Sequence, residues 1–127
     1  MTLNARSLER LKGVHPHLCK VIQAAADAVT EFTFQVSEGL RTRERQRELV
    51  AAGKSQTQNS RHLTGHAVDL VILNPDGSAN WNFRQYAALD VLVQSVAMPL
   101  GIPVEWGGNW KSLRDGPHWQ LPHVLYK

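Results

Sequence analysis

Residues 60–73 read Ser-Arg-His-Leu-Thr-Gly-His-Ala-Val-Asp-Leu-Val-Ile-Leu, a polar loop that leads directly into a hydrophobic run. The run from Ala67 to Leu73 has the composition of a strand, and the Asn-Pro-Asp-Gly sequence at 74–77 predicts a turn at its end. Because successive side chains of a strand point to opposite faces, Asp69 faces away from its two apolar neighbours. A carboxylate within so apolar a strand is costly unless it is paired or binds a metal, and Asp69 is therefore a candidate functional residue.

Around this strand, the sequence predicts helices in the first part of the chain and mainly short strands in the second. A short helix is expected at 7–10 with Ser7 as its cap, and Leu18 to Val29 follows helical spacing after a turn at 15–17. The remaining predicted elements are a strand at 32–36, a charged helix at 41–52, a helix at 83–100, and short strands at 103–106 and 118–121. Short connections between them favour an α+β domain over a doubly wound fold.

The composition sets broad limits on the function. The 127 residues suit one domain, and 43% hydrophobic with 20% charged residues is typical of a globular protein. No apolar run approaches the roughly 20 residues that span a bilayer. Cys19 is the only cysteine, which excludes an intrachain disulfide and a thiolate zinc cluster. The net charge of +3 suits an anionic partner, and a nucleic-acid-binding module would rest on this charge alone.

Histidines near the strand suggest what Asp69 could bind. Two imidazoles and one carboxylate, with a fourth position open for water, form a catalytic zinc site. His62 precedes the strand on a loop, and His118 is the best-placed second imidazole because it begins another strand after a turn. Spacing alone leaves this triad as one option among several. His66 could be a fourth metal neighbour, a hydrogen-bond donor to a ligand or a stabiliser of the transition state, whereas the other three histidines are expected to be satisfied polar residues.

Three sequence elements carry a resemblance to a known family. The run Ser-x-His-x-x-Gly-x-Ala-x-Asp from Ser60 to Asp69 resembles the signature of the zinc peptidases that include D-alanyl-D-alanine carboxypeptidases and L-alanyl-D-glutamate endopeptidases. Residues 38–42, Glu-Gly-Leu-Arg-Thr, are similar to the family's Ser-Gly-x-Arg-[Ser/Thr] element, with Glu38 in place of Ser. The Trp-Gly-Gly-Asn-Trp sequence at 106–110 and the Asp-Gly-Pro-His-Trp sequence at 115–119 match its carboxy-terminal half. The length also resembles that of compact bacteriophage endolysins.

The resemblance implies a role for each matching residue. His62, Asp69 and His118 are the implied ligands of one Zn²⁺ ion. Asp115, three residues before the last ligand, matches the family's catalytic carboxylate. A regular strand would aim Asp115 to the opposite face, but the Gly-Pro turn that follows it can point it back toward the metal. Glu105 is the alternative base.

Four further residues complete the expected site. Arg41 matches the family's active-site arginine, and we expect it to stabilise the carbonyl oxygen. The alternative is that Arg41 belongs to the solvated face of a charged helix. Ser60 is expected to support a ligand or cap its loop, and Trp110 to line a substrate groove. His66 is expected to contact the substrate or a ligand.

The fold and function implied by the resemblance are specific. We expect a single peptidase domain over 1–127 with the hedgehog/D-Ala-D-Ala peptidase fold, in which a small antiparallel sheet carries the zinc site on one face and helices on the other. The expected activity is hydrolysis of the L-alanyl-D-glutamate bond in peptidoglycan stem peptides. The alternatives are a D-alanyl-D-alanine carboxypeptidase and a non-catalytic, hedgehog-like zinc-binding domain.

The expected partner and location follow from the same resemblance. The partner is bacterial peptidoglycan, with no nucleic acid and no membrane insertion, and the protein is expected to be a monomer. The first six residues have no apolar stretch behind them that could serve as a secretory signal. We therefore expect the protein to be made in the cytoplasm without a signal peptide and to act on the cell wall after release.

Overall fold

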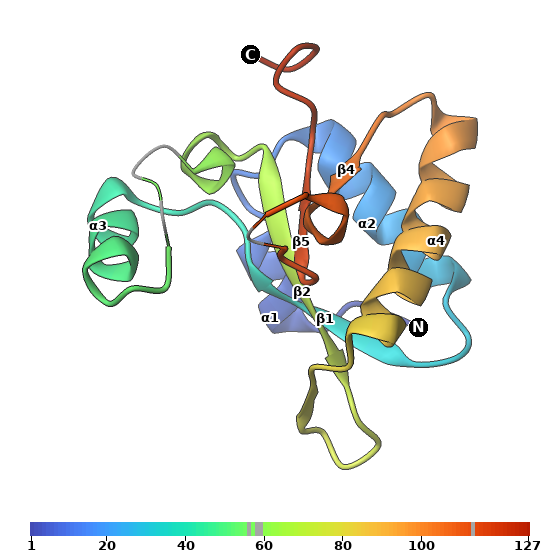
Figure 1. The fold of residues 1–127 in the computed structure, drawn as a ribbon. Helices are drawn as coiled ribbons and strands as arrows, with labels where there is room; N and C mark the ends of the chain where they lie inside the picture. Colours follow the sequence, from blue (N-terminus) through green and yellow to red (C-terminus); the bar gives the residue numbers. More distant parts are fainter. Residues whose placement is uncertain (56, 58–59, 113) are drawn as a thin grey trace.

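The computed structural model describes residues 1–55, 57, 60–112 and 114–127 and is built around a five-stranded antiparallel sheet (Figure 1). Strand β2 (Ala67–Leu73) is central. It pairs with β1 (Thr33–Glu38) along one edge and with β5 (His118–Gln120) and β3 (Ala79–Asn80) along the other, and β4 (Glu105–Trp106) pairs with β5. The expected α+β class with an antiparallel sheet is confirmed, and β2 has the predicted bounds.

Within the described residues, four α-helices and two short 3-10 helices surround this sheet. They are α1 (Ala5–Arg10), α2 (Pro16–Ala28), α3 (Arg43–Ala51), α4 (Phe83–Leu100), η1 (Arg61–Thr64) and η2 (Gly107–Asn109). Figure 1 shows α2 and α4 on one side of β2 and α3 standing on the opposite side. None of the described helices is long and apolar enough to cross a membrane.

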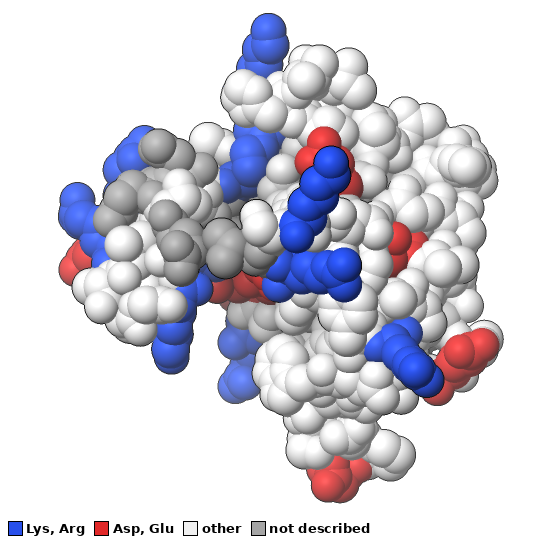
Figure 2. All heavy atoms as spheres, viewed as in Figure 1, with Lys and Arg blue, Asp and Glu red and all other residues white. Residues whose placement is uncertain are grey.

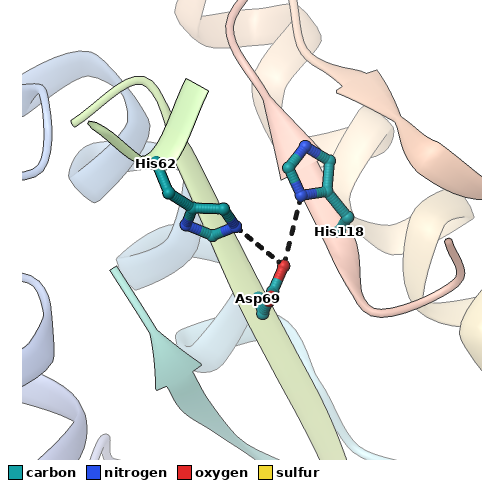
Figure 3. Close-up of side chains that lie close together, drawn as sticks. All are labelled: His62, Asp69 and His118. Carbon is teal, nitrogen blue, oxygen red and sulfur yellow. Dashed lines mark hydrogen bonds and ion pairs between the residues drawn. The ribbon is translucent and has the colours of Figure 1, made fainter. Parts of the chain in front are cut away.

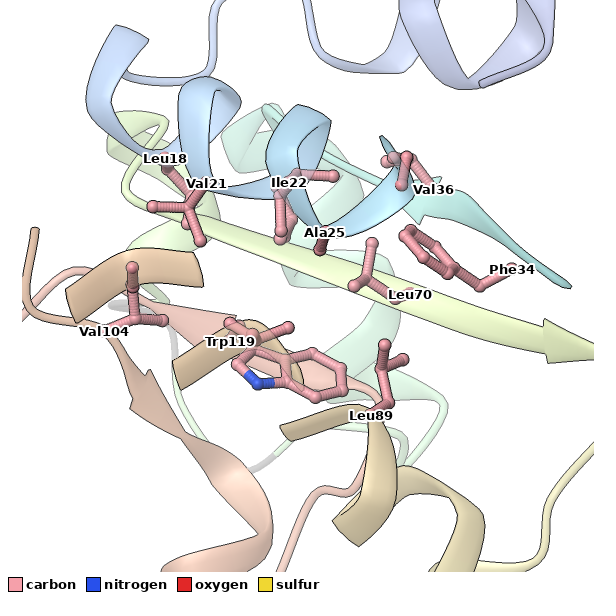
Figure 4. Close-up of a cluster of buried hydrophobic side chains, with 14 of the residues drawn as sticks. Leu18, Val21, Ile22, Ala25, Phe34, Val36, Leu70, Leu89, Val104 and Trp119 are labelled. Atoms are coloured by element: carbon pink, nitrogen blue, oxygen red, sulfur yellow. The ribbon is translucent and has the colours of Figure 1, made fainter. Parts of the chain in front are cut away.

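The hydrophobic core lies between the sheet and the pair α2 and α4. Leu18 and Ile22 of α2, Leu70 of β2, Leu89 of α4 and Trp119 of β5 are fully buried and meet in one cluster (Figure 4). The indole N–H of Trp119 donates to the Asp90 carboxylate at 3.0 Å, so its polar atom is satisfied within the core. Burial of these side chains is the main stabilising term of the fold, and it leaves the opposite face of β2 free for polar residues.

Strand register brings polar side chains together on that opposite face. Asp69 of β2 lies directly opposite His118 of β5, so both side chains project from the same face. On the other edge, a register shift between Val36 and Glu38 pairs Glu38 with Asp69. Regular alternation would place Glu38 on the same face as Val36, toward the core. The bulge therefore turns Glu38 to the face that carries Asp69.

Several predicted boundaries differ from the structure. Ser7 is buried inside α1 instead of capping it, and the cap is Asn4, whose side-chain oxygen accepts from the Ser7 N–H at 2.8 Å. The charged helix begins at Arg43 after a Thr42 cap, so Arg41 lies outside it. The pattern also did not predict β3, which is only two residues long.

Ser7 provides a test of how α1 is joined to the sheet. Its hydroxyl accepts the backbone N–H of Val36 at 3.0 Å, and this contact is buried. Ser7→Ala would leave that N–H buried without a partner, so we expect the free energy of unfolding to fall by about 1–3 kcal/mol in urea titrations. Ser95→Ala, at an exposed position on α4, is the matched control and should change stability by less than about 0.5 kcal/mol. Equal effects of the two substitutions would contradict this account.

Candidate metal centre

Three side chains from separate segments converge on the polar face of β2. The His62 Nε2 atom lies 3.1 Å from Asp69 Oδ1, and the His118 Nδ1 atom lies 3.2 Å from the same oxygen (Figure 3). One ligand atom from each residue falls within 4.8 Å of the others. Both imidazoles are buried. The structure thus brings together the three residues that the sequence singles out, in a group that could hold a metal ion.

The outer nitrogen of each imidazole has its own acceptor. His62 Nδ1 lies 2.9 Å from the carbonyl oxygen of Gly39 and can donate only to it. His118 Nε2 lies 2.8 Å from Gln120 Oε1, and the Gln120 amide donates in turn to Glu105 at 3.2 Å. These bonds orient the rings and leave the lone pairs of the inner nitrogens directed at Asp69, the arrangement typical of metal-binding histidines. Glu105, the alternative base, therefore supports a ligand instead of lining the site.

The charges of the triad shift one another's pKa values. Burial opposes ionisation of Asp69, but hydrogen bonds and positive charge from His118 and His62 outweigh it and hold the pKa of this carboxyl far below its usual range. Burial lowers the pKa of His118, but the Asp69 carboxylate more than compensates and leaves the pKa raised. Two imidazole nitrogens and a carboxylate oxygen held this close need either a shared proton or a metal cation between them.

Local structure before β2 places His62. Ser60 caps η1 because its hydroxyl accepts the His62 backbone N–H at 3.2 Å. Gly65 ends η1 with a φ of +76°, and a Cβ atom at this position would lie 2.3 Å from the carbonyl oxygen of Gly13. Only glycine fits this backbone conformation and this close approach, which explains the glycine between His62 and Asp69.

A rigid frame positions Asp115 beside the triad. The residues before His118 form a turn in which the His118 N–H donates to the Asp115 carbonyl at 3.2 Å, and the Trp106 indole N–H donates to the Gly116 carbonyl at 2.7 Å. A Cβ atom on Gly107 would come within 2.5 Å of the Asp115 carbonyl oxygen, so the Trp-Gly-Gly sequence allows this close packing. Asp115 lines the same cavity as the triad, and burial and the charge of Asp69 raise its pKa.

Arg41 is held by several acceptors at once. Its Nε and Nη2 atoms donate to the two oxygens of Glu38 at 2.8 and 2.7 Å. Its Nη1 atom donates to Gln46 at 2.7 Å and to Ser60 at 3.5 Å, and Nη2 lies 3.8 Å from Asp69 Oδ2. Four of these contacts lie within hydrogen-bond distance, whereas the approach to Asp69 is an ion pair. These contacts show that Arg41 holds Glu38 and lies close to Asp69, and its expected donation to a carbonyl oxygen stays a prediction.

A cavity of about 650 Å³ opens over these residues. The triad, Asp115, Arg41 and Ser60 all line it, and Trp110 forms part of its wall, with its ring centroid 5.1 Å from that of His118. The cavity is large enough for a short peptide segment and gives the triad access to solvent.

Comparisons with known proteins identify the family. The profile of the phage L-alanyl-D-glutamate peptidase family matches residues 1–120. The chain belongs to this family. It is 35% identical over 91 residues to the L-alanyl-D-glutamate peptidase of Listeria phage A118, covering 72% of this chain and 31% of that protein. It is 33% identical over 100 residues to the peptidoglycan L-alanyl-D-glutamate endopeptidase CwlK of Bacillus subtilis strain 168, covering 68% of this chain and 59% of that protein.

A solved structure resembles this chain over almost its whole length. The crystal structure of the L-Ala D-Glu endopeptidase ChiX from Serratia marcescens is similar with a TM-score of 0.89 and 52% sequence identity. The match covers 99% of this chain and 93% of that one. By contrast, the chain spans only 31% and 59% of the lengths of the two curated relatives. The family resemblance found in the sequence and the expected fold are confirmed.

His66 was expected to contact the substrate or a ligand, but the structure places it outside the cavity lining. His66 lies just before β2, contacts Thr64 through Nδ1 at 2.7 Å, and has its ring centroid 5.6 Å from that of His15. It is not among the described residues that line the cavity.

Two residues of the site were not predicted. Glu38 stood out in the sequence only as a departure from the family element, yet it makes the bidentate bond to Arg41. Gln46, fully buried on α3, bonds to Arg41, to Ser55 and to the carbonyl oxygen of Thr57. A glutamine within a charged helix gives no signal of this role. The spacing of Glu38 and Arg41, three residues apart with opposite charges, is the signal that could have indicated their pairing.

The ligand set can be tested by metal analysis. We expect one zinc ion per chain in the purified protein, and its loss from Asp69→Ala, because two imidazoles alone make a weak site. His66→Ala is the matched control and should keep its zinc, since His66 is not among the described residues that line the cavity of the triad. Elemental analysis after dialysis measures both. Loss of zinc from His66→Ala, or its retention by Asp69→Ala, would show that the ligand list is wrong.

The metal-free protein should have a characteristic dependence of stability on pH. The pKa of His118 is raised above its ordinary 6.5, so its contribution is complete below pH 6.5 and is lost as the pH rises through the raised value. The pKa of Asp69 is lowered from 3.8, so its contribution is present above pH 3.8 and is lost in stronger acid. We therefore expect thermal unfolding with a chelator to show greatest stability between these limits.

Zinc should offset the loss of stability that the metal-free protein shows above pH 6.5. Metal binding requires unprotonated imidazoles, so the rise in Tm on adding zinc should grow between about pH 6 and pH 8. His118→Gln cannot take up the proton and should lack the fall in stability above pH 6.5. A chelated wild-type protein that becomes more stable from pH 6.5 to 8 would contradict the pairing of Asp69 with a protonated His118.

Proposed function

We propose that this protein is a zinc peptidase that hydrolyses the L-alanyl-D-glutamate bond of peptidoglycan stem peptides. The observation that carries the proposal is the convergence of His62, Asp69 and His118, with Asp115, on one cavity. Two imidazole nitrogens and a carboxylate suit zinc, and the open side of the group suits a catalytic ion better than a structural one. When bound, the zinc ion supplies Lewis acidity, which lowers the pKa of water to about 7 and polarises a carbonyl group.

Asp115 is the proposed general base. Its turn places it on the cavity wall next to the triad, and its raised pKa brings it closer to the pH at which a base is efficient. In this role the Asp115 carboxylate accepts a proton from the attacking water and then gives it to the leaving amine. Glu105 is less suitable because it is hydrogen-bonded to Gln120 on the far side of His118.

Arg41 is proposed as a positioning residue. Its side chain is 8% exposed, and it holds Glu38 on one side while its charge lies 3.8 Å from Asp69 on the other. The positive charge of Arg41 also opposes the rise in the pKa of Asp115. Its ion pair with Asp69 Oδ2 is proposed to hold that carboxylate in place beside the imidazoles. Trp110 is proposed to contact the substrate, because its ring forms the wall beside His118.

The proposed substrate rests on the relatives. The names of the Listeria phage, Bacillus subtilis and Serratia marcescens proteins all specify the bond between L-alanine and D-glutamate. None of these names specifies cleavage between two D-alanines. We therefore assign the action of this protein to peptidoglycan in the cell wall, with cleavage on the amino side of the glutamate.

Digestion of purified peptidoglycan tests the function. Mass spectrometry should find new amino-terminal D-glutamate and new carboxy-terminal L-alanine, with the reaction stopped by a chelator and restored by zinc. Release of D-alanine alone would indicate a carboxypeptidase instead. Zinc binding without any cleavage would indicate a binding domain.

Asp115→Asn tests the base. This substitution keeps the size of the side chain but removes the proton acceptor, so we expect kcat to fall by roughly 10²–10⁴-fold while one zinc stays bound. Asp27→Asn, at an exposed position on α2, is the control and should keep full activity. Wild-type activity in Asp115→Asn would refute the assignment, and loss of its zinc would show that Asp115 is a ligand.

A further inference from the structure

Two basic side chains on the cavity wall have no role in the site described so far. Lys54, in the segment after α3, and Arg114, just before Asp115, both line the cavity that contains the triad. Both residues are exposed. Figure 2 shows Lys and Arg side chains gathered on this face, around the region between α3 and the sheet, with acidic atoms visible below them.

Apart from Asp115, the proposed base, the other charged groups among the described residues of the cavity have partners of their own. Glu38 is paired with Arg41 through two hydrogen bonds, and Asp69 is held by the two imidazoles. Arg61 also lines the cavity, but its guanidinium donates to the carbonyl oxygens of Leu121 and Tyr126 at 3.2 and 2.6 Å. Its position is therefore set by the end of the chain.

Lys54 and Arg114 differ from these residues. Within the described part of the chain, neither makes an ion pair or a side-chain hydrogen bond. Their charges are thus free to meet an anionic group in the cavity, where the field of a cation is stronger than on an open surface.

The chemistry of the proposed substrate supplies such a group. A glutamate residue within a peptide uses one of its two carboxyl groups to continue the chain, and the other stays free as a carboxylate. The scissile bond involves the nitrogen of this same residue, so the free carboxylate lies within a few bonds of the leaving amine. Asp115 is the group proposed to protonate that amine, and Arg114 is its neighbour in the chain.

We propose that Arg114, assisted by Lys54, binds the free carboxylate of the D-glutamate residue and makes the enzyme selective for stem peptides in which this carboxyl is not amidated. The inference rests on the proposed function. Arginine suits the task because its planar guanidinium can form two parallel hydrogen bonds with a carboxylate. An amide carries no charge and offers only one oxygen to these donors.

The test compares two synthetic stem peptides, one with a free glutamate carboxylate and one with the corresponding carboxamide. We expect wild-type kcat/KM to favour the free acid by about tenfold, the effect of one charge-assisted hydrogen bond pair. Arg114→Gln should lose most of this preference by slowing cleavage of the acid while leaving the amide nearly unchanged. Arg114→Lys should retain part of it, and Lys54→Gln should reduce it less.

Controls separate selectivity from general effects. Arg84→Gln removes an exposed cation outside the residues that line the cavity and should keep the full preference. Zinc content and Tm of the Arg114 variants should match those of the wild type. If Arg114→Gln slows both peptides equally, the cation attracts anionic material in general and the proposal is overturned.

The wild-type enzyme alone distinguishes the two levels of failure. Equal cleavage of acid and amide at the alanyl-glutamate bond would refute the carboxylate contact and leave the proposed function intact. Absence of cleavage of both peptides at that bond, by zinc-loaded enzyme, would refute the proposed function itself.

Discussion

The Asp69 carboxylate lies in the central strand of the sheet, between Val68 and Leu70, whose side chains are fully buried. Burying a carboxylate without partners costs several kcal/mol, so this position is tolerable only when cations or strong donors surround it. The surrounding structure provides them from three directions: His62 from η1, His118 from β5 and Arg41 from the segment before α3. Each of these segments is held near β2 by its own backbone contacts. The position of Asp69 therefore constrains loops that are far apart in the chain.

Strand pairing arranges charged side chains beside Asp69 on one face of the sheet. Glu38, Asp69 and His118 form one row across β1, β2 and β5, and the bulge in β1 is what includes Glu38 in it. The turn before β5 adds Asp115 on the cavity wall, held by the packing of Trp106 and Gly107. The same turn leads into His118, and a Cβ atom on Gly107 would also lie 3.2 Å from the His118 Cβ. The Trp-Gly-Gly frame therefore supports both the proposed base and one member of the triad.

How much of the fold and the site the sequence predicted depended on how far apart in the chain the contacting residues lie. The bounds of β2 and α4 were predicted because apolar patterning and local caps determine them, and His62 and Asp69 were linked because they are close in the chain. His118 lies 49 residues after Asp69, and no periodicity reveals that pairing, so its strand and turn context made it one option and the family resemblance selected it. The inward turn of Glu38 was not predictable, because a bulge breaks the alternation on which strand patterns depend. Arg41 was identified, but its hydrogen bonds to Glu38 and Gln46 were not predicted.

The contrast between Arg41 and Arg114 shows why charge counting from sequence is insufficient. Both are arginines that line the cavity of the metal triad, yet Arg41 is buried with most of its donors engaged, whereas Arg114 is exposed and makes no described ion pair. A guanidinium already fixed by Glu38 and Gln46 would have to give up those bonds to meet a substrate, which costs as much as it gains. An unpaired guanidinium loses only side-chain freedom and hydration. Substrate selectivity is therefore more readily built on the exposed arginine, and the geometry of the metal ligands on the buried one.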